Sequence, residues 1–197
     1  MEGKKVEVLL LAAGEAKRMG FNKLMLPYKG KPLLIHALES ALEASSKVVL
    51  VTGCYEPEVL DTLKTYSFIN HPSLVVLHNP NYSQGQFSST LVGLQAITKG
   101  QCCAIALSDA PLIKKEHYAF LLDHLEDYDG VRVFYHSTPG HPMLCSSNVV
   151  ELALKEKNTS SMRTFLVDKY INNIESGDPS WVTDIDTIDS YNALSRL

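Results

Sequence analysis

Apolar runs of strand length alternate with stretches of helical periodicity from residue 6 to residue 135. The strand-like runs cover residues 6–11, 47–52, 74–77, 102–107 and 131–135, and the helix-like stretches cover 32–44, 56–66, 87–98 and 115–125. This order is typical of α/β proteins, because each crossover helix packs on a sheet of parallel strands. We therefore predict a three-layer α/β fold with a mainly parallel sheet, formed by residues 1–197 as a single domain.

The pattern is less regular after residue 136. A Pro-Gly pair at 139–140 indicates a turn. We expect helices at 147–155 and 161–169, with short strand-like stretches at 170–175 and 181–185. The sequence contains no internal repeat, linker or low-complexity tract, which favours one domain.

The segment LAAGEAKRMGFNK, from Leu11 to Lys23, follows the first predicted strand and has the composition of an anion-binding loop. Small residues let the backbone approach a ligand and leave N–H groups free to bind anions. Arg18 and Lys23 add two cations suited to phosphates. The spacing fits neither G-x-x-x-x-G-K-[ST] nor G-x-G-x-x-G. We predict a site for a nucleoside triphosphate, the alternative being an ordinary surface loop with scattered charges.

Four motif residues directly follow four of the predicted strands: Gly14, Gly53, Asn79 and Asp109. Ligands of open α/β sheets bind at the carboxyl ends of the strands. We therefore expect these residues to converge on one edge of the sheet.

The loop from Leu11 to Lys23 resembles the signature of small nucleotidyltransferases with a Rossmann-like, GT-A-like fold, and in particular of molybdenum cofactor cytidylyltransferases. Similar segments follow in the order of that family: LMLPYKGKPL at 24–33, NPNYSQGQFSSTL at 79–91, LSDAPL at 107–112, GHP at 140–142 and DIDTIDSY at 184–191. Together they extend from about residue 6 to residue 194.

The sequence departs from the family pattern at several positions. Ala110 and Ile188 replace the usual residues of their motifs, and Glu15 and Ala16 stand where small or hydroxyl residues are common. The family's G-D-x-G-A-R loop corresponds to NTSSMR at 158–163, in which the arginine, Arg163, is retained. The departure at 158–163 puts the pterin-side contacts in doubt more than the nucleotide side.

The resemblance implies a Mg²⁺ site with aspartate ligands. Mg²⁺ takes one or two carboxylates from a protein and completes its coordination shell with phosphate and water oxygens. Asp109 is the first expected ligand, and a helix N-cap is its alternative role. The second ligand is Asp184 or Asp186, which lie on the same side of an extended segment. The resemblance favours Asp186, whose alternative role is to cap the final helix.

The resemblance also assigns the remaining site residues. Arg18, Lys23 and Asp109 would be catalytic. The nucleotide would bind at Leu11, Ala12, Ala13, Gly14, Arg18, Lys23, Gly53, Ser88 and Asp109. The acceptor would bind at Asn79, Gly85, Ser89, Gly140, His141, Pro142 and Arg163. For Ser88 and Ser89, ordinary helix capping is the alternative.

The implied activity is Mg²⁺-dependent transfer of CMP from CTP to molybdopterin, with release of pyrophosphate. The alanine pair before Gly14 resembles the cytidine-using branch, whereas a glycine pair resembles the guanine-using branch. The alternatives are a guanylyltransferase or a sugar- or polyol-phosphate nucleotidyltransferase. A protein of another class, a carrier that delivers the finished dinucleotide to an apo-oxidoreductase, would have no need of a magnesium site.

The composition limits the partners of the chain. The net charge is −4 and no basic patch is evident, so nucleic acid is not an expected partner. No apolar run approaches the roughly 18 residues of a membrane span, and no signal peptide precedes the first strand. We expect a cytoplasmic protein whose partners are CTP, a molybdopterin-type cofactor and a molybdenum hydroxylase that receives the product.

Overall fold

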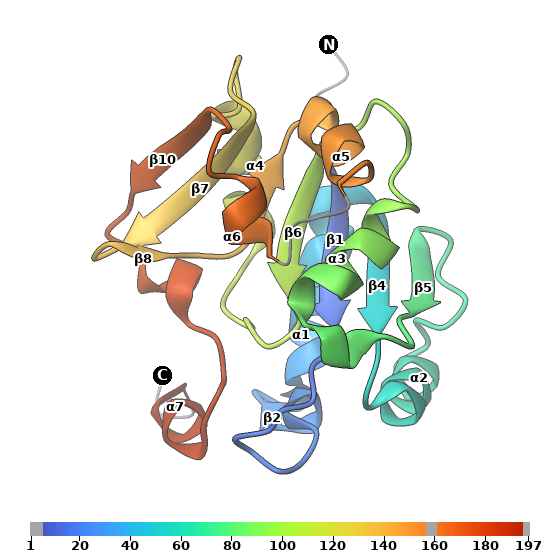
Figure 1. Ribbon diagram of the computed structural model, residues 1–197. Coiled ribbons are helices and arrows are strands. Elements are labelled where there is room, and N and C mark those ends of the chain that lie inside the picture. The colour runs from blue at the N-terminus through green and yellow to red at the C-terminus, as the bar shows by residue number, and fades with distance from the viewer. Residues whose placement is uncertain (1–5, 157–160, 195–197) are drawn as a thin grey trace.

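A mixed, mainly parallel sheet carries helices on both faces in the computed structural model, which describes residues 6–156 and 161–194 (Figure 1). Its strand order is β10-β7-β9-β6-β1-β4-β5, and β8 pairs with β7. Their bounds are β1 Val6–Ala12, β4 Ser45–Thr52, β5 Leu74–His78, β6 Cys103–Leu107, β7 Gly130–Tyr135, β8 Thr138–Pro139, β9 Met143–Cys145 and β10 Ile171–Glu175. The pairs β6–β1, β1–β4, β4–β5 and β7–β10 are parallel, whereas β9 is antiparallel to both β6 and β7. The predicted α/β fold is confirmed.

Alternate side chains of the central strand enter two separate cores. In β1, Val8 and Leu10 pack with α1 (Leu33–Ala44), α2 (Glu56–Thr65) and α4 (Lys115–Asp123). Leu9 and Leu11 pack on the other face with α3 (Gln86–Leu94), α5 (Ser147–Ala153) and α6 (Met162–Phe165). Successive strand side chains point to opposite faces, so a continuous apolar run such as residues 8–12 requires cover on both sides.

The C-terminal segment passes along the edge where β1 and β6 end. It follows the short helix η3 (Pro179–Val182) and leads into α7 (Ile188–Leu194). Ile185 is fully buried in a third apolar cluster with Tyr28, Leu33 and Leu194. Tyr28 lies in the small hairpin of β2 (Pro27–Tyr28) and β3 (Lys31–Pro32). This cluster fixes the C-terminal segment beside the first loop.

Two predicted helices are shorter in the structure. The helix expected at 87–98 ends at Leu94, and further on the N–H of Thr98 donates to the buried carboxylate of Glu7 over 2.8 Å. That N–H is therefore satisfied outside the helix. The helix expected at 161–169 is a single turn, α6, whose N-cap is Ser161.

The prediction of a strand at 181–185 was wrong. Asp178 caps η3 by accepting from the N–H of Ser180, and Pro179 occupies the first helical position, so a 3₁₀ turn forms there. Strand β9 was not predicted, because three residues are too few for an alternating pattern to show. Part of the predicted NTSSMR counterpart, residues 158–160, lies outside the described residues. In the described ranges, no helix has the length and apolar character needed to cross a membrane.

Candidate active site

A cavity of about 600 Å³ opens at the carboxyl ends of β1 and β6. It is lined by Leu11, Ala12, Ala13, Gly14, Glu15, Ala16, Lys17, Arg18, Asn22, Lys23, Leu24, Tyr82, Ser83, Gly85, Gln86, Ser89, Leu107, Asp109, Asp184 and Asp186. Of the residues predicted to bind nucleotide, all except Gly53 and Ser88 line it. The structure therefore brings the first loop together with the aspartates from the distant end of the chain.

A tight turn in the first loop directs its cations into this cavity. Ala16 has a φ of +46°, and its carbonyl accepts from the N–H groups of Met19 and Gly20 at 2.9 and 3.0 Å. The turn leads the chain to the short helix η1 (Lys23–Met25). A methyl group added at Gly14 would meet no atom within 4 Å, so the backbone there is open to the cavity. Such a position suits close approach by a ligand.

Gly53 supports the loop from behind instead of lining the cavity. A Cβ atom at this position would lie 2.6 Å from the carbonyl oxygen of Ala13 and 2.8 Å from Cβ of Tyr82. Only glycine fits this contact without a backbone shift. Gly53 therefore sets the position of Ala13, which does line the cavity.

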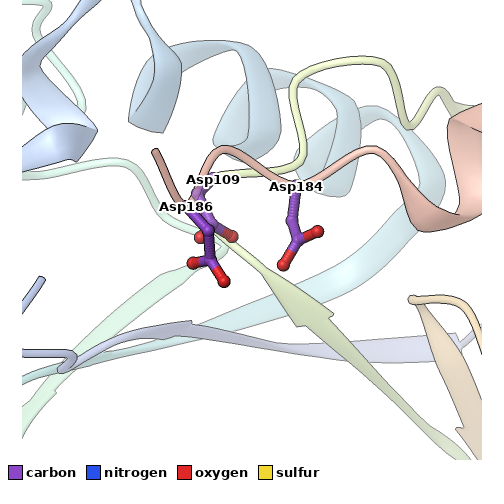
Figure 2. A group of neighbouring side chains, drawn as sticks. All are labelled: Asp109, Asp184 and Asp186. Atoms are coloured by element: carbon purple, nitrogen blue, oxygen red, sulfur yellow. The ribbon is translucent and has the colours of Figure 1, made fainter. Parts of the chain in front are cut away.

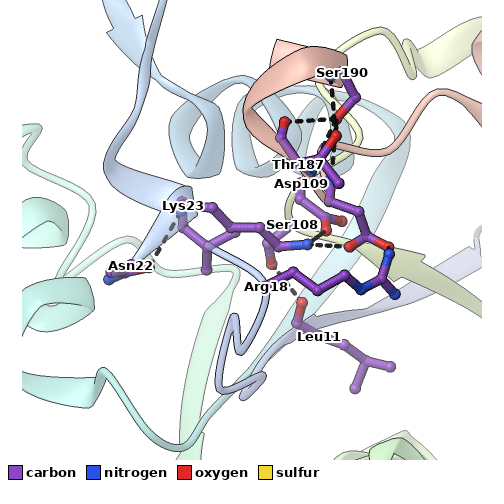
Figure 3. A network of polar contacts seen from close by, with 10 residues as sticks. Leu11, Arg18, Asn22, Lys23, Ser108, Asp109, Thr187 and Ser190 are labelled. Atoms are coloured by element: carbon purple, nitrogen blue, oxygen red, sulfur yellow. Dashed lines mark hydrogen bonds and ion pairs between the residues drawn. The ribbon is translucent and has the colours of Figure 1, made fainter. Parts of the chain in front are cut away.

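Lys23 is held at the centre of the polar network in Figure 3. Asn22 caps η1 by accepting from the N–H of Leu24 over 3.2 Å, and its amide donates to Glu58 of α2 over 3.1 Å. Lys23 Nζ forms ion pairs with Asp109 and, at 2.6 Å, with Oδ1 of Asp186. One ammonium group thus bridges the end of β6 and the C-terminal segment.

Three carboxylates, those of Asp109, Asp184 and Asp186, lie close together (Figure 2). One oxygen from each of Asp109, Asp184 and Asp186 lies within 4.8 Å of the others. Asp184 and Asp186 point to the same side because the residue between them, Ile185, points into the apolar cluster. Arg18 adds an ion pair of 3.1 Å to Oδ2 of Asp186, although most of the Arg18 side chain is exposed.

The alternative capping roles of the two predicted metal ligands do not apply. The helix after Asp109, α4, has Lys114 as its N-cap. At the last helix, Thr187 Oγ1 accepts from the N–H of Ser190, while Ser190 Oγ accepts from the N–H groups of Asp186 and Thr187 at 3.2 and 3.1 Å (Figure 3). Neither Asp109 nor Asp186 therefore caps a helix, and both line the first cavity.

The charges around Lys23 shift its pKa and those of its neighbours. Burial lowers the pKa of Lys23, but the carboxylates of Asp109 and Asp186 outweigh it and leave the pKa above the usual value. Burial raises the pKa of Asp109 against the opposing charge of Lys23. The pKa of Asp184 is raised by burial and then by the two other carboxylates, whereas the hydrogen bond from Lys23 lowers the pKa of Asp186.

The acidic cluster has the chemistry of a site for a hard divalent cation. All of its donors are carboxylate oxygens, which Mg²⁺ and Mn²⁺ prefer. The raised pKa values of Asp109 and Asp184 mean that positive charge beyond that of Lys23 would be stabilised here. The residues therefore fit a divalent metal ion.

A second cavity, of about 540 Å³, shares the residue Gln86 with the first. Its lining includes Gly140, His141 and Arg163 of the predicted acceptor site. Gly140 packs against Trp181, whose carbonyl oxygen would lie 2.6 Å from an added Cβ atom. The N–H of His141 donates to that same carbonyl over 2.8 Å. Gly85 and Ser89, also predicted for the acceptor, line the first cavity.

Asn79 has a supporting position in the structure. It is almost fully buried, and its amide donates to the hydroxyls of Ser88 and Ser89, each over 2.9 Å. Its oxygen accepts from the N–H of Asn81. Asn79 and Ser88 line neither cavity, nor does Pro142. Asn79 therefore ties the end of β5 to the start of α3.

Gln86 and Arg132 are among the polar cavity residues that were not predicted from the sequence. Gln86, at the first position of α3, lines both cavities. Arg132 lines the second cavity from the middle of β7. A charged residue between two valines in an otherwise apolar strand is a signal that could have identified Arg132.

Comparison with known proteins places the chain among the nucleotidyltransferases. The MobA-like NTP transferase domain matches residues 8–172, and the chain belongs to this family. It is 28% identical over 188 residues to the molybdenum cofactor cytidylyltransferase of Escherichia coli K12, covering 94% of this chain and 93% of that protein. The resemblance seen in the sequence is thereby confirmed.

Other similarities extend beyond cytidine-using enzymes. A probable molybdenum cofactor guanylyltransferase of Carboxydothermus hydrogenoformans is 29% identical over 122 residues, covering 62% of this chain and 55% of that protein. The crystal structure of Rv0371C from Mycobacterium tuberculosis in complex with manganese superposes with a TM-score of 0.74 and 19% identity, covering 98% of each chain. At this low identity, the structural similarity is evidence for the fold alone.

Proposed function

We propose that this enzyme transfers CMP from CTP to the terminal phosphate of molybdopterin and releases pyrophosphate. The observation that carries the proposal is the position of Lys23 between Asp109 and Asp186, directly beside an open loop that bears Arg18. The similarity to a molybdenum cofactor cytidylyltransferase over nearly the full length of both chains supports the choice of substrates.

In the proposed reaction, a phosphate oxygen of the acceptor attacks the α-phosphorus of CTP. A new bond forms between this oxygen and the α-phosphorus, the bond between the α-phosphorus and the α–β bridging oxygen breaks, and pyrophosphate leaves with the bridging oxygen. The acceptor phosphate is already anionic, so no general base is required. Catalysis then depends on alignment and on stabilisation of the developing charge.

The first loop would supply both effects. The open backbone at Gly14 would receive phosphate oxygens, and Arg18 and Lys23 would neutralise the triphosphate and the leaving pyrophosphate. Both side chains are paired with Asp186 in the structure, so they already face the cavity in which the phosphates would lie. Ala12 and Ala13 would form the wall against the cytosine.

Asp109 and Asp186, with Asp184 beside them, would hold Mg²⁺, which when bound supplies positive charge to the phosphate oxygens. The three carboxylate oxygens lie close enough together to share one ion.

The acceptor would extend from the first cavity into the second, past Gln86. Gly140, His141 and Arg163 would contact the part of the acceptor that does not react. We place the enzyme in the cytoplasm, where it would pass its product to a molybdenum hydroxylase.

Pyrophosphate release in the presence of molybdopterin and Mg²⁺ tests this function. We expect release with CTP, little with GTP, ATP or UTP, and a loss of about 10²-fold or more in Asp109→Asn. The Lys64→Gln variant, on the exposed face of α2, is the matched control and should retain the wild-type rate.

Each of the other outcomes would support a different function. Release with GTP would support a guanylyltransferase, as the second relative suggests. Release only with sugar or polyol phosphates as acceptors would keep the mechanism and replace the acceptor. Tight nucleotide binding without release for any acceptor would support a dinucleotide carrier.

A further inference from the structure

Arg132 lies in the middle of β7, and its side chain is on the opposite face of the sheet from those of Val131 and Val133. Val131 and Val133 are fully buried in the core that contains α4. Arg132 and Phe134 project to the opposite face of the sheet and line the second cavity. A half-buried cation that belongs to none of the family motifs therefore points into the second cavity.

The guanidinium of Arg132 is incompletely satisfied. Its Nη2 donates to the thioether sulfur of Met143 over 2.9 Å, and sulfur is a weak acceptor. Its Nε is buried and has no hydrogen-bond partner in the described part of the chain. Among residues 6–156 and 161–194, no carboxylate forms an ion pair with either Arg132 or Arg163.

The surroundings of Arg132 disfavour its charge. Burial, together with the nearby charge of Arg163, lowers the pKa of the Arg132 guanidinium. Withdrawing a cation from water without an anion or a full set of acceptors destabilises a protein. An anionic ligand would remove this penalty, and an apolar side chain at this position would avoid it altogether.

We propose that Arg132, with Arg163 at the rim, binds an anionic group of the acceptor in the second cavity and is a specificity-determining residue of the enzyme. This inference rests on the proposed function, since it concerns the same acceptor. The anionic group is separate from the reacting phosphate, which must reach the first cavity.

The rest of the lining indicates what carries the anionic group. Six of the twelve other lining residues have large apolar side chains: Phe87, Ile105, Phe134, Pro139, Met143 and Met162. Among the residues that the structure describes, no aspartate or glutamate lines this cavity. Such walls suit a flat ring, and the two arginines suit the anionic substituent. Acceptors with a ring but no such anion should therefore bind poorly.

A pair of fluorescent probes tests this inference without any transfer reaction: pterin-6-carboxylate and unsubstituted pterin. We expect the wild-type protein to bind the carboxylate about tenfold or more tightly than pterin. Arg132→Gln should lose this preference while binding pterin as the wild type does. Arg132→Lys, which keeps the charge but not the fork of donors, should retain part of it.

Thermal unfolding separates recognition from a structural role. If Arg132 serves a ligand, Arg132→Met should unfold at the same temperature as the wild type or higher, because it removes the unsatisfied group. A lowered unfolding temperature, an unchanged carboxylate preference in Arg132→Gln, or no binding of pterin-6-carboxylate by the wild type would each overturn the inference.

The proposed transfer reaction can fail independently. If the probes behave as expected but CTP releases no pyrophosphate with molybdopterin, only the reaction is wrong. If transfer proceeds and the acceptor KM is the same in Arg132→Gln, the reaction stands and the role of Arg132 is rejected. The KM for CTP should be unchanged in all Arg132 variants.

Discussion

The backbone N–H of Ile185 donates a hydrogen bond of 3.1 Å to the carbonyl oxygen of Asp109. This bond joins the end of β6 to the C-terminal segment. The Ile185 side chain is buried in the cluster with Tyr28 and Leu33, so its two neighbours turn toward the cavity. An acidic cluster assembled from both halves of the chain thus depends on one apolar anchor.

We expect Ile185→Ala to lower the free energy of unfolding by about 2–5 kcal/mol, because it leaves a cavity in this cluster. Nucleotidyl transfer should fall as well, since Asp184 and Asp186 lose their fixed position. Urea denaturation measures the first effect and pyrophosphate release the second. Ile188→Ala is the control, because Ile188 is 46% exposed and should change stability by less than about 1 kcal/mol. Equal losses in the two variants would show that Ile185 is not an anchor.

The relative importance of Asp186 and Asp184 as metal ligands follows from their charge states. The hydrogen bond from Lys23 lowers the pKa of Asp186, whereas burial and like charges raise that of Asp184. Ionised carboxylates bind Mg²⁺ more strongly. We expect Asp186→Asn to raise the Mg²⁺ concentration for half-maximal rate roughly tenfold or more, and Asp184→Asn to raise it less. The reverse order in a Mg²⁺ titration would make Asp184 the principal ligand.

The sequence predicts the central sheet well because parallel strands that are buried on both faces are made mostly of apolar residues. The runs at 6–11 and 102–107 need cover on both faces, and this requirement leaves few alternatives. The convergence of Gly14 and Asp109 follows directly from that topology. The position of Asp184 and Asp186 beside them came instead from motif resemblance, since no local pattern relates residue 186 to residue 23.

The elements that were predicted poorly depend on distant partners. The helix after Gln86 stops early, and Thr98 is bonded to Glu7, which is far away in sequence. Asn79 was predicted to bind the acceptor, and in the structure its amide donates hydrogen bonds to the hydroxyls of Ser88 and Ser89. Hydrogen bonds of this kind cannot be derived from residue spacing alone.

His141 lines the second cavity, and its burial leads us to expect that stability depends on pH. Burial lowers the pKa of His141 below its usual value of 6.5. Above pH 6.5, His141 is neutral in both the folded and the unfolded state, and its protonation does not reduce stability. As the pH falls below 6.5 the unfolded state takes up a proton first, so stability decreases until the folded-state pKa is passed.

We therefore expect His141→Gln to lose less stability than the wild type between about pH 7.5 and about pH 5.5. Urea denaturation at both pH values measures the difference. The exposed His136 provides the control, because His136→Asn should keep the wild-type pH dependence. If the pH dependence of His141→Gln equals that of the wild type, burial of His141 has no part in it.

Lys23 occupies the carboxylates that a metal ion would use, so its removal should have two opposite effects. Without the ammonium group, Lys23→Met should lose about 10²-fold or more in kcat, because the phosphates lose a cation in the transition state. Its affinity for Mn²⁺ in the absence of nucleotide should rise, because Asp109 and Asp186 no longer have their counter-ion. Pyrophosphate release and Mn²⁺ titration by electron paramagnetic resonance measure the two effects. Lys31→Met is the control, since it breaks the Lys31–Glu39 ion pair, whose residues line neither cavity. Mn²⁺ binding that is unchanged or weaker in Lys23→Met would mean that the lysine and the metal do not compete for these carboxylates.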